Sequence, residues 1–234
     1  MITTSSTTSA TPPSADSPDW SDSVPTEVVL DTFDGYYLFA WVKNAEGLVN
    51  ERYVPLHVQY SDPAPYIPAA GEVIFTEVMR NPAVVGDEQG EWFELYNTRF
   101  ESIYLGDYPV SDTDVDPDTF TIEADLFIPA HGYLVFCAGA EDLSYVTSDY
   151  LYSYADMALS NTGDELVLET SASTEIDRIE YDGTWPGGAG VSMELDPTTL
   201  SSGDNDDPAN WHDAIDAYGG GDLGTPGAAN SSGI

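Results

Sequence analysis

Residues 72–82, Glu72-Val-Ile-Phe-Thr-Glu-Val-Met-Arg-Asn-Pro82, and residues 91–97, Glu91-Trp-Phe-Glu-Leu-Tyr-Asn97, decide the fold class of this chain. Both stretches predict a short β-strand. The first strand must end before Pro82, because proline has no N–H group to donate to a sheet ladder. Successive side chains of a strand point to opposite faces. We therefore expect Trp92 and Phe93 on opposite faces of a sheet, one in the core and the other against a partner, a second sheet or water.

The same pattern of short strands separated by turn residues continues to residue 230. No segment shows the sustained 3.6-residue period of a helix. The stretch Asn161-Thr-Gly163, which precedes an alternating strand, has the composition of a hairpin turn. The pattern predicts an all-β sandwich. The strands expected in it include Val73–Met79, Trp92–Tyr96, Tyr133–Cys137, Glu165–Glu169 and Ile176–Tyr181.

The residues that precede the sandwich region fall into segments of different composition. The start is rich in Ser, Thr, Pro and Asp, which predicts a flexible linker. Two strand-like runs follow, and in the first of them Tyr37, Phe39 and Trp41 alternate with other residues at period two. A proline-rich stretch then predicts a stiff linker. The expected organisation is a disordered linker over 1–19, a two-strand segment within 20–62, a linker over 63–70, the sandwich over 71–230 and a tail over 231–234.

Eight phrases of the sandwich region, taken in order, resemble the lamin tail domain, an immunoglobulin-like β-sandwich found in bacterial surface and secreted proteins and in nuclear lamins. Besides the two opening stretches, the most specific are Leu159-Ser-Asn-Thr-Gly-Asp164 and Thr225-Pro-Gly-Ala-Ala-Asn230. The chain departs from the family where Tyr108 replaces a usual tryptophan. The resemblance implies structural motif roles for Glu77, Asn81, Pro82, Glu91, Trp92, Glu94, Asn97, Gly132, Asn161, Gly163, Asp164, Asp177, Pro226, Gly227 and Asn230.

The N-terminal segment carries a second resemblance. Residues 35–47 are similar to the last strands of a bacterial immunoglobulin-like repeat. This implies a partial immunoglobulin-like segment within residues 20–62. A few strands rarely fold alone, so the segment is expected to pack on something or to belong to a larger protein.

The charge of the chain is extreme, with 42 acidic residues against 5 basic ones and a formal net charge of −37. Such a surface repels nucleic-acid phosphates and anionic lipid, because both are bound by clustered Lys and Arg. Direct nucleic-acid binding is therefore excluded, and no run of residues is apolar for the length of a membrane span. Two explanations fit the charge: adaptation to a salty environment, or loading with divalent cations.

No catalytic constellation is found in the sequence. His57, His131 and His212 lie in separate segments without zinc-ligand spacing. Ser192 lacks the second glycine of a nucleophile elbow. Cys137, the only cysteine, lies in a strand-like run and is expected to be a buried apolar residue. The sequence therefore predicts no enzyme activity and no cofactor, with calcium as the one exception considered.

The calcium candidate is Asp112-Thr-Asp-Val-Asp-Pro-Asp118, in which carboxylates alternate, with Glu123 at the twelfth place. This resembles the ligand order of an EF-hand loop. Pro117 stands where a glycine is needed, and a strand follows instead of a helix. The open alternatives are a weak calcium site, with Asp112, Asp114, Asp116, Asp118 and Glu123 as ligands, and a solvated loop.

The resemblance implies a non-catalytic interaction, scaffolding or targeting module of a secreted or cell-surface multidomain protein. One alternative is a calcium-dependent carbohydrate- or protein-binding domain, and another is an accessory domain of an extracellular hydrolase such as a nuclease or phosphatase. The expected partner is a protein or a cell-surface polysaccharide. The aromatic residues considered for surface contact, with core packing as the alternative, are Tyr96, Tyr104, Tyr108 and Trp185.

Overall fold

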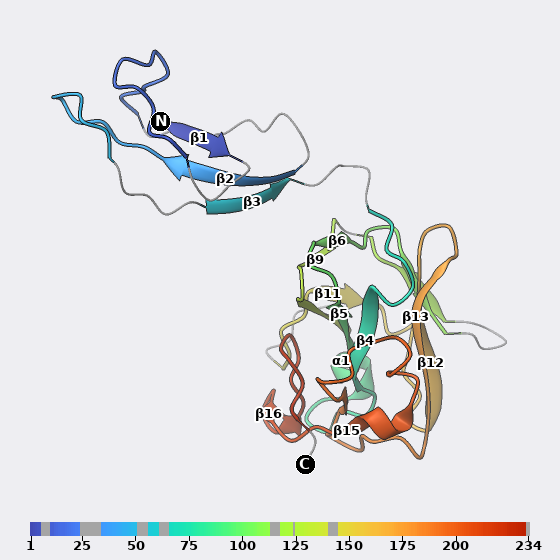
Figure 1. Ribbon diagram of the computed structural model, residues 1–234. Helices are drawn as coiled ribbons and strands as arrows, with labels where there is room; N and C mark the ends of the chain where they lie inside the picture. The colour runs from blue at the N-terminus through green and yellow to red at the C-terminus, as the bar shows by residue number, and fades with distance from the viewer. Residues whose placement is uncertain are drawn as a thin grey trace. The chain divides into compact units, whose positions relative to one another are not determined.

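The chain forms two compact units, Met1–Pro65 and Tyr66–Ile234 (Figure 1). A computed structural model describes residues 1–5, 10–23, 34–50, 56–60, 66–112, 118–123, 125–139 and 145–232. In these residues no helix has the length and apolar character needed to cross a membrane.

The first unit contains a three-stranded antiparallel sheet of order β1-β2-β3. Its strands are β1 (Ile2–Ser5), β2 (Asp34–Ala40) and β3 (Leu56–Tyr60). Phe39 and Trp41 are buried on one face, with ring centroids 6.1 Å apart.

The expectation of a disordered linker over residues 1–19 is wrong for its first residues. β1 pairs with β2 along its whole length, with Ile2 opposite Ala40. The indole N–H of Trp41 also donates to Thr3 Oγ1 at 2.7 Å. The physical reason is that the free edge of β2 presents unpaired backbone groups, which an extended segment of almost any polar composition can bond.

The second unit is a sandwich of two sheets (Figure 1). One has six strands in the order β11-β10-β5-β4-β14-β15, and the other has four in the order β13-β12-β7-β8. All neighbours are antiparallel except β10 and β11. The elements of both sheets are β4 (Val73–Met79), β5 (Trp92–Asn97), β7 (Pro109–Ser111), β8 (Thr119–Thr121), β10 (Tyr133–Ala138), β11 (Tyr150–Tyr152), β12 (Gly163–Glu169), β13 (Glu175–Asp182), β14 (Met193–Leu195) and β15 (Trp211–Asp213).

Smaller elements lie at the ends of the sandwich. The two-stranded pair of β6 (Ile103–Tyr104) and β9 (Phe127–Ile128) is at one end, and the pair of β16 (Ala217–Tyr218) and β17 (Asp222–Leu223) is at the other (Figure 1). A short helix α1 (Asp87–Gly90) precedes β5, and a 3-10 turn η1 (Pro208–Asn210) precedes β15. The all-β immunoglobulin-like sandwich is thus confirmed, and each of the five expected strands is found within two residues of its predicted bounds.

The core between the two sheets is centred on Phe93 of β5, which is fully buried. Its ring stacks on Phe136 of β10 with centroids 5.1 Å apart, and meets Phe75 of β4 edge-on at 5.6 Å. Tyr152 of β11 lies 5.8 Å away on the same face. Aromatic contacts of this kind add to the stabilisation from burial alone.

The other face of the six-stranded sheet is also covered. Trp92 is fully buried there in a second cluster with Met79, Val135 and Cys137. Trp92 and Phe93 therefore point to opposite faces as expected, and Cys137 is buried as expected. The Trp92 indole donates to Tyr218 Oη at 2.8 Å, so the chain beyond β15 closes this face.

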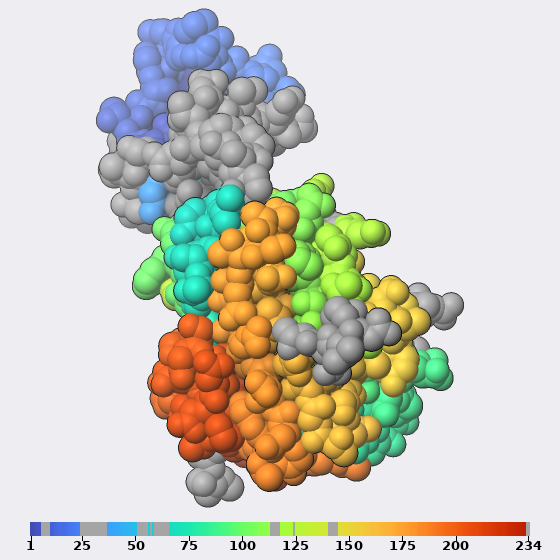
Figure 2. Space-filling model, turned by 90° about the vertical axis from the view of Figure 1, so that its right-hand side faces the viewer, coloured from blue at the N-terminus to red at the C-terminus, as the bar shows by residue number. Residues whose placement is uncertain are grey.

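One side of the second unit is seen in Figure 2. Residues 66–75 lie beside the β12–β13 hairpin, shown in orange. The contact is made by the backbone, since Gly71 N–H donates to the Ile176 carbonyl at 2.7 Å. The segment that enters the unit is therefore fixed to the edge of the four-stranded sheet.

Candidate functional site

Three buried glutamates lie side by side across the covered outer face of the six-stranded sheet. Glu77 of β4 is the register partner of both Glu94 on β5 and Glu194 on β14. Glu194 is in turn the partner of His212 on β15. All three carboxyl groups belong to residues with no exposed surface. A carboxylate that is buried away from water without a partner is unfavourable. The groups that donate hydrogen bonds to the three glutamates therefore determine the role of the row.

The donors to Glu77 come from two segments distant in sequence. Ser192 Oγ donates to Glu77 Oε1 at 2.5 Å. The Thr225 backbone N–H donates to the same oxygen at 2.9 Å, and Thr225 Oγ1 lies 3.1 Å from Glu77 Oε2. Thr225 Oγ1 also lies 2.9 Å from Glu194 Oε1, so one hydroxyl sits between two carboxyl groups.

The other two glutamates bind the same C-terminal segment, residues 224–231. Glu94 accepts a bond from the Gly227 N–H at 2.8 Å, and Glu194 accepts one from the Ser231 N–H at 3.1 Å. Asn230 Nδ2 donates to the carbonyls of Thr76 and Leu195, each at 2.8 Å. Side chains of three adjacent strands therefore hold the C-terminal segment over the sheet.

Two glycines allow this close approach. A Cβ atom on Gly224 would lie 2.7 Å from Glu77 Oε1 and 3.1 Å from the Trp92 ring. Gly227 has a φ of 81°, in the left-handed region that favours glycine. The Thr-Pro-Gly phrase of the sequence is thus a turn that fits against carboxyl groups.

Burial changes the acidity of this row. Desolvation, together with the charge of the neighbouring Glu194, raises the pKa of Glu77 to about 8. Desolvation, together with the charge of Glu77, holds the pKa of Glu94 well above its usual range. At neutral pH Glu77 and Glu94 therefore retain protons that free carboxyl groups would have lost.

Some of the motif residues named from the sequence lie in this row or against it. Glu77, Glu94, Gly227 and Asn230 are brought together, and Pro226 lies in the same turn. Residues that the sequence prediction missed are Ser192, Glu194, Thr225 and Ser231. A usable signal was present for Glu194, which stands between Met193 and Leu195 as a charged residue inside an apolar strand.

A second group of motif residues lies at the turn before β12. Glu91 Oε2 accepts a bond from the Leu159 N–H at 2.7 Å, and Asp164 accepts one from the Ser160 N–H at 2.6 Å. Desolvation raises the pKa of Glu91 to about 8 and that of Asp164 to about 6. Asn161 donates to Asp87 at 3.3 Å, and Gly163 opens β12. These carboxyl groups fix the loop to the sandwich.

The remaining motif residues are dispersed. Asp177 of β13 is buried and accepts bonds from the Phe75 N–H and from Asn205 Nδ2, at 2.8 and 2.7 Å. The Asn81 carbonyl accepts a bond from the Gly190 N–H at 2.7 Å, and Pro82 is buried in the turn after β4. Asp177 and Asn81 thus accept bonds from backbone N–H groups that would otherwise lack a partner.

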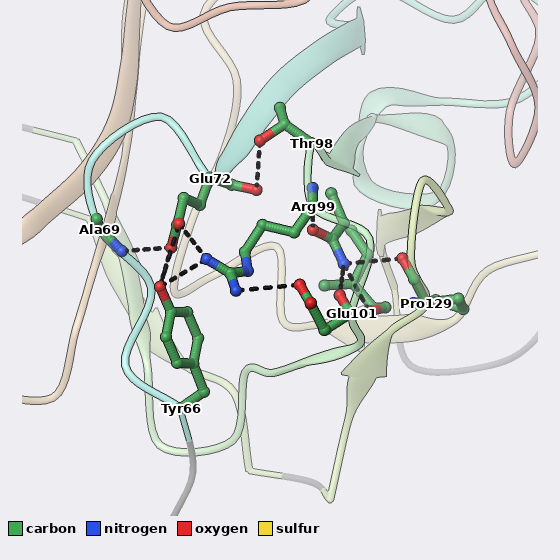
Figure 3. Close-up of polar contacts among 9 residues, drawn as sticks. Tyr66, Ala69, Glu72, Thr98, Arg99, Glu101 and Pro129 are labelled. Atoms are coloured by element: carbon green, nitrogen blue, oxygen red, sulfur yellow. Dashed lines mark hydrogen bonds and ion pairs between the residues drawn. The ribbon is translucent and has the colours of Figure 1, made fainter. Parts of the chain in front are cut away.

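At the end of the sandwich that carries β6 and β9, Asn97 and Arg99 organise a more exposed network (Figure 3). Asn97 Nδ2 donates to the carbonyls of Glu101, Ile128 and Pro129 at 2.8, 3.2 and 2.9 Å. Gly132, in the facing turn, accepts a bond from the Asn97 N–H at 3.0 Å. Asn97 therefore bonds the bend that carries Arg99.

Arg99 is held by groups on both sides. Its guanidinium forms ion pairs with Glu72 at 2.5 Å and with Glu101 at 3.0 Å. It also donates to Tyr66 Oη at 2.8 Å and lies 4.3 Å from the centroid of the Tyr66 ring. Tyr66 Oη donates in turn to Glu72 at 2.8 Å. Figure 3 shows these side chains converging from the chain before β4 and the loop after β5.

Of the four aromatic residues considered for surface contact, two are exposed in part. Tyr108 and Trp185 are buried, at 3% and 8% exposure, and belong to the core. Tyr96 and Tyr104 are partly exposed, and both lie at the Arg99 end.

The calcium candidate is only partly covered by the structure. Asp114 and Asp116 lie outside the described residues. Asp112 and Asp118 face each other where β7 and β8 leave the hairpin loop, and Asp112 Oδ1 accepts a bond from the Asp118 N–H at 3.1 Å.

Glu123 does not complete that candidate set. The strand pairing runs on to Ile122, whose N–H donates to the Tyr108 carbonyl. Extended residues rise about 3.3 Å each, so Glu123 lies roughly 16 Å along the chain from Asp118. Calcium ligands lie about 2.3–2.6 Å from the ion. A strand rather than a returning loop separates Asp118 from Glu123, and calcium binding at this loop stays a prediction.

Within the described part of the chain, no three His, Cys, Asp or Glu side chains are placed to hold a metal ion. The three histidines belong to separate elements: His57 is in β3 of the first unit, His131 is in the turn before β10, and His212 is in β15. The three glutamates of the row are closed to solvent and bonded to the C-terminal segment.

The family model described as Lamin Tail Domain matches residues 67–183, half of the chain. Curated proteins yielded no significant match.

Proposed function

Because the chain belongs to the lamin tail domain family, a family of non-enzymatic immunoglobulin-like interaction domains, we propose that it is a non-catalytic interaction, scaffolding or targeting module of a larger secreted or cell-surface protein. The observation that carries the proposal is that the buried carboxyl groups bind the chain's own C-terminal segment. Glu77, Glu94 and Glu194 all accept bonds from the C-terminal segment and have no exposed surface. Groups that a substrate cannot reach hold the fold rather than perform a reaction.

The unusual charge supports a place outside the cell. Residues 71–234 carry 33 acidic residues and 3 arginines, a net −30. Repulsion of this size disfavours self-association, and adaptation to a salty environment is one explanation of such a surface. We assign the chain to the bacterial-type members of the family, with the first unit as the end of an immunoglobulin-like repeat. Its three-stranded sheet is consistent with that assignment.

A fluorescent fusion tests the proposal directly. The full chain fused to a fluorescent protein should be retained on the outside of source cells, and the fluorescent protein alone should not. The purified chain should also leave nitrophenyl phosphate, nitrophenyl glycosides and plasmid DNA unchanged. Turnover of any of them, abolished in a Glu77→Gln variant, would show an enzyme and end this proposal.

Calcium-dependent binding is the second function, favoured by the pairing of Asp112 with Asp118 at the mouth of their loop. In this alternative, millimolar calcium raises the melting temperature of the full chain above the value in matched magnesium or EDTA, because a ligand that binds only the folded state stabilises it. The rise should disappear in an Asp112→Asn, Asp118→Asn double variant. Equal stabilisation by calcium, magnesium and sodium would mean that salt only screens the acidic surface.

A further inference from the structure

Exposed apolar side chains gather at the Arg99 end of the second unit. Its described residues include six large hydrophobic side chains that are strongly exposed, and four of them are at this end. They are Tyr66 at 47%, Ile67 at 65%, Phe100 at 84% and Phe127 at 49% exposure. Scattered single apolar residues are ordinary on a protein surface, whereas a group of them marks an interaction site.

Ring contacts at this end of the unit form two groups. Phe100 meets His131 edge-on with centroids 4.5 Å apart, and Tyr96 lies 6.3 Å from the same His131 ring. On the β6–β9 pair, Tyr104 and Phe127 are register partners with rings 5.1 Å apart. We call this the aromatic end surface, made of Tyr66, Ile67, Tyr96, Phe100, Tyr104, Phe127 and His131.

Carboxyl groups lie among the rings. Glu101 is about half exposed beside Arg99. Asp125 is exposed and accepts a bond from Tyr104 Oη at 3.2 Å. Aromatic faces attract cations, and carboxylates pair with them, so the surface combines two kinds of group that favour a positively charged ligand.

The chain already binds one guanidinium in this way. Arg99 lies over the Tyr66 ring while it pairs with Glu72 and Glu101 (Figure 3). The same combination of ring and carboxylate is present at Tyr104, Phe127 and Asp125, where no arginine among the described residues pairs with it.

We infer that the aromatic end surface binds a basic segment of a protein partner, in which Arg or Lys residues alternate with apolar ones. The inference rests on the proposed interaction function and names its surface and the charge of its partner. The net charge of −30 favours a cationic partner and disfavours a second copy of the chain. Tyr104 and Phe127 are inclined by 58° and Phe100 and His131 by 88°, so the rings form no flat platform for a sugar chain.

The test is a titration of the full chain with synthetic peptides near 0.15 M salt. The probe is a twelve-residue peptide of Arg-Leu-Ser repeats, and the matched peptide has Glu in place of Arg. We expect the Arg peptide to bind and the Glu peptide not to bind. A Phe100→Ala, Phe127→Ala double variant should lose tenfold or more in affinity, because exposed aromatic anchors dominate such interfaces. All these side chains are exposed, so the variants should keep the melting temperature of the parent.

Two controls distinguish binding of the peptide at this surface from its non-specific attraction to an acidic protein. Ile215→Ala removes a residue that is 52% exposed at the opposite end, and should change the affinity less than twofold. Glu101→Gln should weaken binding more than Asp216→Asn, which removes an exposed charge near β16.

Equal affinities of the double variant and the parent would overturn the inference, as would failure of the Arg peptide to bind. Binding of the Arg peptide at another surface would contradict the assignment of the aromatic end surface. It would not contradict the proposed interaction function. Enzymatic turnover, which the peptide titration does not measure, is what would remove the proposed function itself. Stronger binding after removal of residues 1–65 would show that the first unit occupies the surface, and would also contradict the inference.

Discussion

Truncation of the chain after Leu223 should lower the melting temperature of the second unit by 10 °C or more. The deletion removes the donors Thr225, Gly227 and Ser231 from the glutamate row. It also leaves the carbonyls that Asn230 bonds without a partner. Each lost hydrogen bond costs about 0.5–1.5 kcal/mol, and each buried polar group left without a partner costs about 1–3 kcal/mol. A loss of 1 kcal/mol shifts the melting temperature of a domain this size by about 2–4 °C. Hydration of the newly exposed carboxylates offsets part of the loss.

Differential scanning calorimetry measures this effect, with a truncation after Ser232 as the control. That control keeps every bond described above and should melt like the parent. A smaller variant, Asn230→Ala, should cost about 2–3 kcal/mol, because two buried carbonyls lose their donor. If the Leu223 truncation melts within 2 °C of the parent, the C-terminal segment only rests on the sheet and the row does not hold it.

The second unit should become less stable as the pH rises from about 5 to about 8. Burial raises the pKa of Glu77 from an ordinary value near 4.5 to about 8 in the folded state. Below pH 4.5 this group is protonated in both states and has no effect on stability. Between the two pKa values the unfolded chain has lost a proton that the folded chain keeps, so the free energy of unfolding falls as the pH rises. Above about pH 8 Glu77 is ionised in both the folded and the unfolded state. The free energy of unfolding has then fallen by its full amount, on the order of a few kcal/mol.

Repulsion between the charges of a chain of net charge −37 is also expected to lower its stability as the pH rises. The measurement therefore needs high salt and a control variant. Thermal melts between pH 5 and pH 9 should be made at roughly 0.5 M salt, where exposed charges are screened but buried ones are not. A Glu77→Gln variant, which stays neutral at every pH, should show a flatter profile than the parent. An exposed control, Asp216→Asn, should leave the profile unchanged. Equal slopes for the parent and Glu77→Gln would assign the pH dependence to the surface.

The strands and their faces could be predicted because they depend on local alternation. Val73–Met79 was expected with the bounds that are found, and Trp92 and Phe93 point to opposite faces as alternation requires. The strand β1 could not be predicted in this way. Its residues have no apolar alternation, and only the presence of the β2 edge gives their backbone groups a partner.

The sequence also determined that the chain is very acidic, nearly all-β and without an evident catalytic motif. It could name Glu77, Glu94 and Asn230 as motif residues, yet not that they meet, because that contact joins positions more than 130 residues apart. Only the pairing of β5, β4 and β14 sets the glutamates in one row under the C-terminal segment. Likewise, the exposure of Phe100 and the burial of Tyr108 and Trp185 were decided by tertiary packing. An aromatic side chain is equally favourable in a core or at an interface, and what lies opposite it determines which role it takes.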